Sequence, residues 1–223
     1  MDLALVWQHR GFLLSGTVTT IYITLGAISL GALLGLIVGM ARLSQNRLAA
    51  TLSLIYVTII RGTPMLLQIL FFFFGIPQMY MLLTGQSLSP SPVLTGIIGL
   101  GINSGAYMGE IVRGGIQSIE KGQMEAARSL GLNHGQAMRF VILPQAIKRI
   151  IPSLANEFIV LLKDSSLVSS IGAGELMYNS RVMGAKYYAF PAFLMGAAIV
   201  YLSLTMVFAQ LVTRLERRLA VSD

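Results

Sequence analysis

Long apolar segments dominate the chain and predict its helices. Residues 11–41 contain no Asp, Glu, Lys, Arg or His, and an apolar run of roughly 18 residues or more is typical of a membrane-spanning helix. This run is also too long for the core of a signal peptide, so we expect it to remain in the mature protein. The same criterion predicts an all-α, polytopic membrane helical bundle, one domain over residues 1–223, with five transmembrane helices at 11–41, 48–74, 93–112, 151–171 and 187–213.

The second apolar run contains an interruption, Arg61-Gly62-Thr63-Pro64. A break there would leave residues 48–60 as a separate segment, which is shorter than the roughly 17 residues needed to cross a bilayer. Proline removes a backbone donor and bends a helix without always ending it. We therefore predict a single helix over 48–74, kinked near Pro64.

The distribution of Lys and Arg predicts the orientation, because short cytoplasmic loops accumulate these residues. With the amino terminus outside and the carboxyl terminus in the cytoplasm, only Arg10, Arg181 and Lys186 fall on the outer side. Arg61 and Lys163 lie at membrane depth. The segment 114–149 becomes a cytoplasmic loop, and the cytoplasmic side collects eleven basic residues: Arg42, Arg47, Arg113, Lys121, Arg128, Arg139, Lys148, Arg149, Arg214, Arg217 and Arg218.

Composition agrees with a membrane protein and excludes several other classes. Hydrophobic residues make up 55% of the chain and charged residues only 11%, which is too little charge for a water-soluble surface. The net charge of +7 is spread over short connections instead of forming one basic face, so we expect no nucleic-acid partner. The chain has no cysteine, and its two histidines, His9 and His134, are far apart. We expect no metal site.

Glycines recur at four-residue spacing in two predicted helices. Such ridges let helix backbones approach closely in lipid, where packing drives association. We expect this contact within one subunit, and a contact between subunits is the alternative. The two ridges are Gly31, Gly35 and Gly39 in the first helix, and Gly101, Gly105 and Gly109 in the third.

The predicted cytoplasmic loop contains two short helices. Residues 123–130 favour a helix, and Gly131 stands where a left-handed helix terminus favours glycine. Asn133 with Gln136 three residues later indicates a capping box at the start of a second helix, and Pro144 is expected to limit that helix. From periodicity alone, an ordinary amphipathic surface loop explains this pattern equally well.

Residue identities in the loop distinguish these alternatives. Glu125-Ala126-Ala127, then Gly131, then Ile142-Leu143-Pro144 resemble the EAA signature of binding-protein-dependent ABC importer permeases. The resemblance implies that the loop is a coupling helix that docks on an ATP-hydrolysing subunit. It also implies that Ala126, Ala127 and Gly131 permit close contact and that Glu125 orients or anchors the helix.

Segments elsewhere in the chain resemble the polar-amino-acid branch of these permeases, whose members have five spans with the amino terminus outside. The resemblance extends over nearly the whole chain. The segments are Arg61-Gly62-Thr63-Pro64 followed by Gln68, Glu110-Ile111-Val112-Arg113-Gly114-Gly115-Ile116, and Leu161-Leu162-Lys163-Asp164-Ser165-Ser166-Leu167.

Four charged residues lie at predicted membrane depth: Arg61, Glu157, Lys163 and Asp164. Glu110 shares a face of the third predicted helix with Asn103 and Tyr107, but it lies near the cytoplasmic end, where we expect it to pair with Arg113. An uncompensated charge at membrane depth costs roughly 2.5 to 3.5 kcal/mol on insertion scales, so each of the four must face another charge, water or substrate. Glu157 and Asp164 are two helical turns apart on one face, and Lys163 points about 100° away from Asp164. One interpretation is a translocation pathway for polar or cationic amino acids. The other is a set of ion pairs, such as Arg61 with Glu157, that only fix the helices.

The sequence therefore predicts the permease subunit of an ABC importer that carries amino acids into the cytoplasm across the bacterial inner membrane by alternating access. The chain has no phosphate-binding loop ending in Lys-Ser or Lys-Thr, so we expect no catalytic residue and no bound cofactor, with ATP and Mg²⁺ held by two partner ATPases. Expected partners also include a second permease subunit, identical or related, an extracytoplasmic solute-binding protein and membrane lipid. The alternatives are an ion-coupled secondary transporter or channel and, with less support, an intramembrane enzyme.

Overall fold

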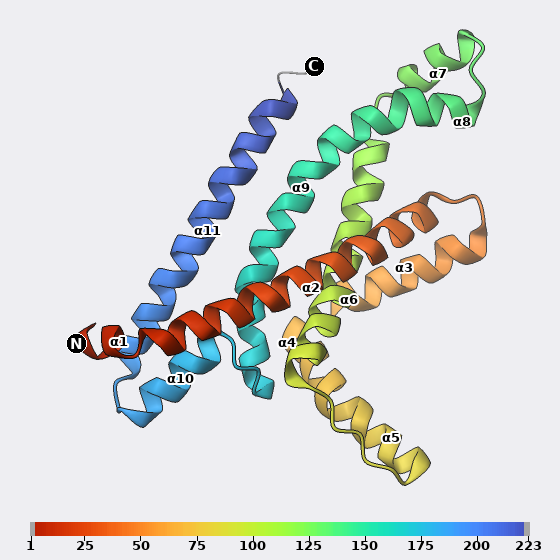
Figure 1. Cartoon of the computed structure of the whole chain (residues 1–223). Coiled ribbons are helices and arrows are strands. Elements are labelled where there is room, and N and C mark those ends of the chain that lie inside the picture. The colour runs from red at the N-terminus through yellow and green to blue at the C-terminus, as the bar shows by residue number, and fades with distance from the viewer. Residues whose placement is uncertain (1–2, 221–223) are drawn as a thin grey trace.

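The computed structural model describes residues 3–220, and every regular element in that range is helical (Figure 1). Short 3-10 and π segments extend several of the α-helices. In chain order the elements are α1 (Leu3–Gln8), α2 (Arg10–Leu43), α3 (Arg47–Gly62), α4 (Met65–Leu70), the π-helix η1 (Phe71–Gly75), α5 (Ile76–Thr84), α6 (Pro92–Gln117), α7 (Lys121–Ser129), α8 (His134–Ala137), the π-helix η2 (Met138–Ile142), α9 (Leu143–Asp164), the 3-10 helix η3 (Ser165–Ile171), α10 (Leu176–Lys186) and α11 (Phe190–Ala220).

The long helices form an open bundle around the contact between α2 and α6. Figure 1 shows α3 beside α2, and α9 running alongside α11. The α7 and α8 helices lie at the same end of the molecule as the carboxyl end of α11, whereas α5 and α10 lie toward the opposite end. The expected cytoplasmic loop and the carboxyl end of α11 are therefore at one end of the fold.

By length and composition, three helical segments among the described residues can cross a membrane: Arg10–Leu43, Met65–Thr84 and Phe190–Arg218. The first and last correspond to the predicted first and fifth spans. The α6 and α9 helices carry polar and charged side chains where the prediction placed the third and fourth spans. The all-helical membrane class is confirmed, and the number of spans is not fixed by this criterion.

The single kinked helix predicted over 48–74 is wrong, because the helix is broken there. The α3 helix ends at Gly62, and both Thr63 (φ −120°, ψ 145°) and Pro64 (φ −62°, ψ 136°) are extended. A residue before proline is pushed out of the helical region, and the proline ring has no N–H to continue the ladder. Helical backbone resumes at Met65 and continues to Thr84, ten residues beyond the predicted end.

The glycine ridges pack against each other within the chain, as predicted. A Cβ atom on Gly31 would lie 3.0 Å from Ser104, and one on Gly39 would lie 2.7 Å from Val112. In the other direction, a Cβ atom on Gly109 would lie 2.6 Å from Val38. Neither backbone could approach this closely with larger side chains, so the glycines set the distance between α2 and α6.

The predicted turn between the two loop helices is confirmed. Gly131 has φ +86° and its N–H donates to the Arg128 carbonyl, while the Leu132 N–H donates to the Ala127 carbonyl. These two bonds form the Schellman arrangement that ends α7. Asn133 and Gln136 form the predicted capping box, with both bonds at 2.9 Å.

Pro144 does not limit the second loop helix, contrary to the prediction. Helical backbone continues from His134 through η2 into α9 without a break. In η2 the Leu143 N–H bonds to the Met138 carbonyl, five residues back. This wider turn precedes Pro144, which occupies one of the first two positions of α9, where a missing N–H is tolerated.

Glu175 joins the start of α10 to α11 by hydrogen bonds, a role that the sequence alone does not indicate. Its side chain is fully buried and caps α10 by accepting bonds from the Met177 and Tyr178 N–H groups, and Tyr201 of α11 donates to it across 2.8 Å. Thr20 of α2 accepts the Leu176 N–H. The carboxylate therefore has its hydrogen bonds satisfied inside the protein.

Candidate functional site

Two of the predicted site residues, Glu157 and Asp164, line one cavity of about 340 Å³. Both come from α9, and both side chains are partly buried. Their seven-residue spacing places them on one helix face, as expected. The other lining residues come from the α3–α4 break, from α6 and from α9 itself: Thr63, Met65, Asn103, Tyr107, Val160 and Leu161.

Ser104 of α6 holds the Glu157 carboxylate in place. Its hydroxyl donates to Glu157 Oε1 across 3.0 Å, and Ser104 itself is fully buried. One carboxylate oxygen is thus used within the protein. The structure shows no protein donor for the second oxygen among residues 3–220, which leaves it able to accept from a ligand.

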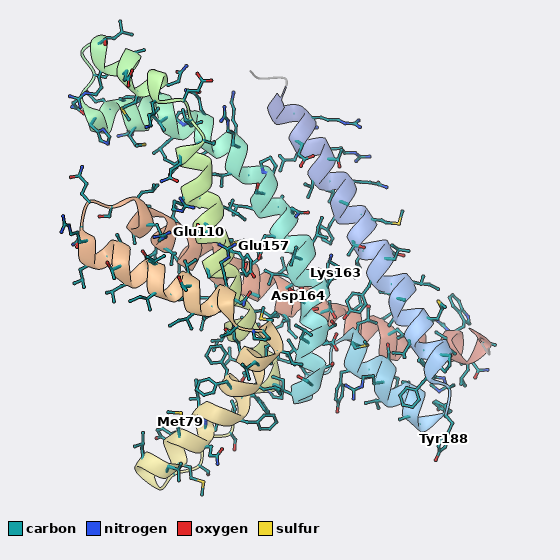
Figure 2. All side chains as sticks on the ribbon, turned by 180° about the vertical axis from the view of Figure 1, so that it is seen from behind. Met79, Glu110, Glu157, Lys163, Asp164 and Tyr188 are labelled. Atoms are coloured by element: carbon teal, nitrogen blue, oxygen red, sulfur yellow. The ribbon has the colours of Figure 1, made fainter. Side chains whose placement is uncertain are left out.

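Lys163 is not in the Glu157–Asp164 cavity. It lines a separate cavity of about 380 Å³ with Ser166, Met177 and residues of α11, including Tyr201. Figure 2 shows Lys163 and Asp164 adjacent on the α9 backbone, with Lys163 toward α11. The four charged residues expected to form one pathway are therefore divided between at least two environments.

Arg61 approaches the cavity indirectly. Its guanidinium carbon lies 4.9 Å from the centroid of the Tyr107 ring, and Tyr107 lines the cavity. Such a contact contributes about 0.5–1 kcal/mol at an exposed site. The suggested ion pair between Arg61 and Glu157 is absent, because within residues 3–220 the ion pairs are those of Glu110.

Glu110 forms a structural charge cluster at the end of α6 nearer α7. It bonds Arg113 at 2.7 Å, the pairing suggested by the sequence, and also Arg42 of α2 at 3.1 Å. The second partner was not predicted, because a contact between residues 68 positions apart depends on how α2 crosses α6. This cluster fixes the two helices and lies outside the set of cavity residues (Figure 2).

The Gln68 side chain supplies hydrogen bonds to backbone carbonyl groups at the α3–α4 break. Pro64 supplies no N–H for the Ile60 carbonyl four residues earlier, and Gln68 Nε2 donates to that carbonyl across 2.8 Å. The same nitrogen also donates to the carbonyl and the hydroxyl oxygen of Thr63, at 3.2 and 2.8 Å. Gln68 Oε1 accepts from Asn103 Nδ2 at 3.0 Å.

The sequence alone does not predict that Thr63, Asn103, Ser104 and Tyr107 contribute to the Glu157–Asp164 cavity. None carries a charge, so the cost of burying ions, which identified Glu157 and Asp164, gave no signal for them. A polar side chain every few residues on a glycine-rich helix was the available signal on α6. By itself this pattern indicates only that Asn103 and Tyr107 share a helix face.

Four of the expected coupling residues, Glu125, Ala126, Ala127 and Gly131, lie in the tip formed by α7 and α8 (121–137), and Pro144 lies at the start of α9. Glu125, Ala126, Gly131 and Pro144 are exposed, whereas Ala127 is only 4% exposed and packs inside the chain. Ala127 therefore supports the tip instead of offering its side chain to a partner.

The tip is joined to the bundle by hydrogen bonds and apolar packing. Arg149 of α9 donates to the Ser118 carbonyl across 2.7 Å, and Gln145 donates to Gln123 of α7 across 3.3 Å. An apolar cluster that includes Ile119, Ile142 and Ile150 packs beneath it. The same two helices, α6 and α9, supply lining residues of the cavity.

The chain combines helices long and apolar enough to cross a membrane with a cavity lined by two carboxylates and an exposed helical tip, which are features typical of the membrane component of a transport system. Residues 31–221 match the family described as binding-protein-dependent transport system inner membrane component. The chain belongs to this family.

Individual relatives narrow the class of transporter. The chain is 34% identical to the glutamine transport system permease protein GlnP of Escherichia coli (strain K12), with 99% of this chain and 98% of the relative covered. It is also 34% identical to the arginine transport system permease protein ArtQ of Bacillus subtilis (strain 168), covering 100% and 99%.

Solved structures agree with this assignment. One chain, from the crystal structure of an amino acid ABC transporter with histidines, superposes with a TM-score of 0.91 at 37% identity, covering 98% of this chain and 99% of that one. An inward-facing MetNI methionine ABC transporter gives 0.69 at 21% identity, covering 93% and 98%, and shares the fold.

The chain is therefore an inner-membrane permease subunit of an amino-acid ABC importer. It is a transport component and not an enzyme, because ATP hydrolysis in this family belongs to a separate subunit. These matches do not favour an ion-coupled secondary transporter or channel.

Proposed function

We propose that the cavity containing Glu157 and Asp164 is the substrate site of the permease and that it favours polar or cationic amino acids. The observation that carries this proposal is the presence of two carboxylates in one cavity without a basic residue among its lining side chains. An ammonium, guanidinium or imidazolium group would compensate both charges at membrane depth. The glutamine, arginine and histidine named for the relatives are consistent with this class.

We propose five membrane spans with the amino terminus outside. The second span would comprise α3, α4, η1 and α5 together, with the break at Thr63–Pro64 inside the membrane. Non-helical backbone is tolerated at that depth where it is buried in protein or lines a cavity, and Gln68 satisfies the exposed carbonyl groups here. The remaining spans would be α2, α6, α9 with η3, and α11.

We propose that two permease subunits, identical or related, pair with two ATPases that hold ATP and Mg²⁺, and that a solute-binding protein delivers substrate from outside. The exposed Glu125, Ala126, Gly131 and Pro144 would form the docking surface for the ATPase. Substrate-dependent motion would pass through the connection of α7 to α6 and α9.

The test uses the complete complex in proteoliposomes, with uptake of L-arginine, L-histidine, L-glutamine and L-glutamate measured side by side. We expect uptake of at least one of the first three, and loss of most of it in Glu157→Gln with basal ATP hydrolysis retained. The matched control is Glu216→Gln, an exposed carboxylate on α11 away from the cavity. Unchanged uptake by Glu157→Gln, or a preference for L-glutamate, would contradict the proposal.

A further inference from the structure

Hydrogen-bond donation runs in one direction from the cavity to the α3–α4 break: the Asn103 amide donates to Gln68, and the Gln68 amide donates to the backbone carbonyls of Ile60 and Thr63. We propose that this pair of amides acts as an orientation relay: Gln68 is a positioning residue that forces Asn103 to present its carbonyl oxygen, Oδ1, to the substrate. Asn103 would thus add a third acceptor to the two carboxylates and select for an N–H donor. The inference rests on the proposed function of the cavity.

The first step is the orientation of the Gln68 side chain. Its nitrogen faces the Ile60 carbonyl, the Thr63 carbonyl and the Thr63 hydroxyl, at 2.8, 3.2 and 2.8 Å. Carbonyl oxygens only accept, so the nitrogen must lie on that side. The reversed amide would bring oxygen against two oxygens in a site where Gln68 is only 7% exposed, which leaves buried acceptors without donors.

In the second step, the orientation of the Gln68 amide fixes the orientation of the Asn103 amide. Because the Gln68 nitrogen is committed to the backbone, its Oε1 faces α6 and accepts from Asn103 Nδ2 across 3.0 Å. A reversed Asn103 would again place two acceptor oxygens together. Asn103 is 8% exposed and lines the cavity, and its Oδ1 has no protein donor within residues 3–220. That oxygen therefore remains available to a ligand.

The third step concerns the chemistry that the cavity offers. The Thr63 hydroxyl is already engaged, since it donates to the Ile59 carbonyl at 2.9 Å and accepts from Gln68. Glu157, Asp164 and Asn103 consequently present acceptors, and the Tyr107 hydroxyl is a lining group that can still donate. A group rich in N–H bonds fits this arrangement, and a carboxylate does not.

The experiment measures equilibrium binding to the purified permease–ATPase complex in nanodiscs, without binding protein. The probes are L-arginine, L-citrulline, which lacks the side-chain cation, and N-acetyl-L-arginine, which lacks the α-ammonium group. Asn103→Leu removes the acceptor and leaves Gln68 to hold the break, whereas Gln68→Met releases Asn103. The matched control is Gln145→Met, an amide that joins α9 to α7 outside the cavity.

In both Asn103→Leu and Gln68→Met we expect the Kd of L-arginine to rise about tenfold or more, as for loss of a bond to a charged group. At least one analogue, the one lacking the donor that Asn103 contacts, should change by much less. An equal factor for all three ligands in Asn103→Leu would overturn the relay, because a purely structural role does not discriminate among them. Two other results would contradict the proposed substrate site itself: no binding of any probe to the wild-type complex, or an unchanged Kd of L-arginine in Glu157→Gln.

Discussion

Ser104 Oγ donates to Glu157 Oε1 across 3.0 Å and so joins α6 to α9 at the cavity. The two residues are 53 positions apart, and each lies in a helix that the α7–α8 tip connects directly to the other. The candidate site and the expected coupling surface are therefore connected to the same two helices, α6 and α9.

Asp164→Asn keeps the side-chain shape and removes the charge. Asp164 lines the cavity while neighbouring Lys163 lines another one, so we expect uptake to fall at least tenfold while membrane yield and basal ATP hydrolysis persist. The measurement compares all three quantities in the single variant and in Asp164→Asn with Lys163→Gln. If only the double variant recovers a normal yield, the two residues form a structural ion pair, whose disruption costs about 3–5 kcal/mol.

Gly35→Ala should destabilise the permease. A Cβ atom there would come within 3.1 Å of the Gly109 backbone and closer still to Met108, and overpacking of this kind typically costs about 1–3 kcal/mol. The matched control is Gly114→Ala, a helical glycine whose added Cβ meets nothing within 4 Å; it should be neutral or stabilising by up to about 1 kcal/mol. Thermal unfolding of the two purified variants gives the comparison. Equal unfolding midpoints would show that the α2–α6 distance is adjustable.

Gly131→Trp should uncouple the permease from its ATPase. The residue is exposed at the tip and has φ +86°, so tryptophan adds both bulk and backbone strain of about 1–2 kcal/mol. Asn tolerates this conformation better, and Gly131→Asn separates the two effects. We expect normal membrane insertion of both variants, with copurification of the ATPase or substrate-stimulated hydrolysis lost chiefly in Gly131→Trp. Normal stimulation of that variant would remove the tip from the coupling mechanism.

Single cysteines test the proposed topology in a chain that has none. Asn133 and Ser89 are both exposed, at the α7–α8 tip and in the segment between α5 and α6. We expect Asn133→Cys to react only with reagents that reach the cytoplasm, and Ser89→Cys to react with an impermeant reagent from outside. Outside labelling of both positions in intact cells would rule out the five-span arrangement.

The sequence was sufficient wherever the determining physics is local. The charge-free segment at 11–41 predicts a lipid-spanning helix regardless of its neighbours, and α2 covers it. Gly131 and the Asn133–Gln136 box predict a turn and a helix start from three or four adjacent residues, and both are present. The cost of burying charge identified Glu157 and Asp164 as residues that require a partner.

Tertiary structure decided the features that depend on which helices meet. Whether Pro64 bends or breaks its helix depends on a substitute donor, and Gln68 supplies one only because α4 folds back toward the end of α3. Lys163 and Asp164 are adjacent in sequence but face different cavities, since successive helical residues point about 100° apart toward different neighbours. The local sequence pattern specifies the helices and their ends. The uncharged residues of the candidate site, such as Asn103 and Ser104, acquire their roles only because α6 crosses α4 and α9.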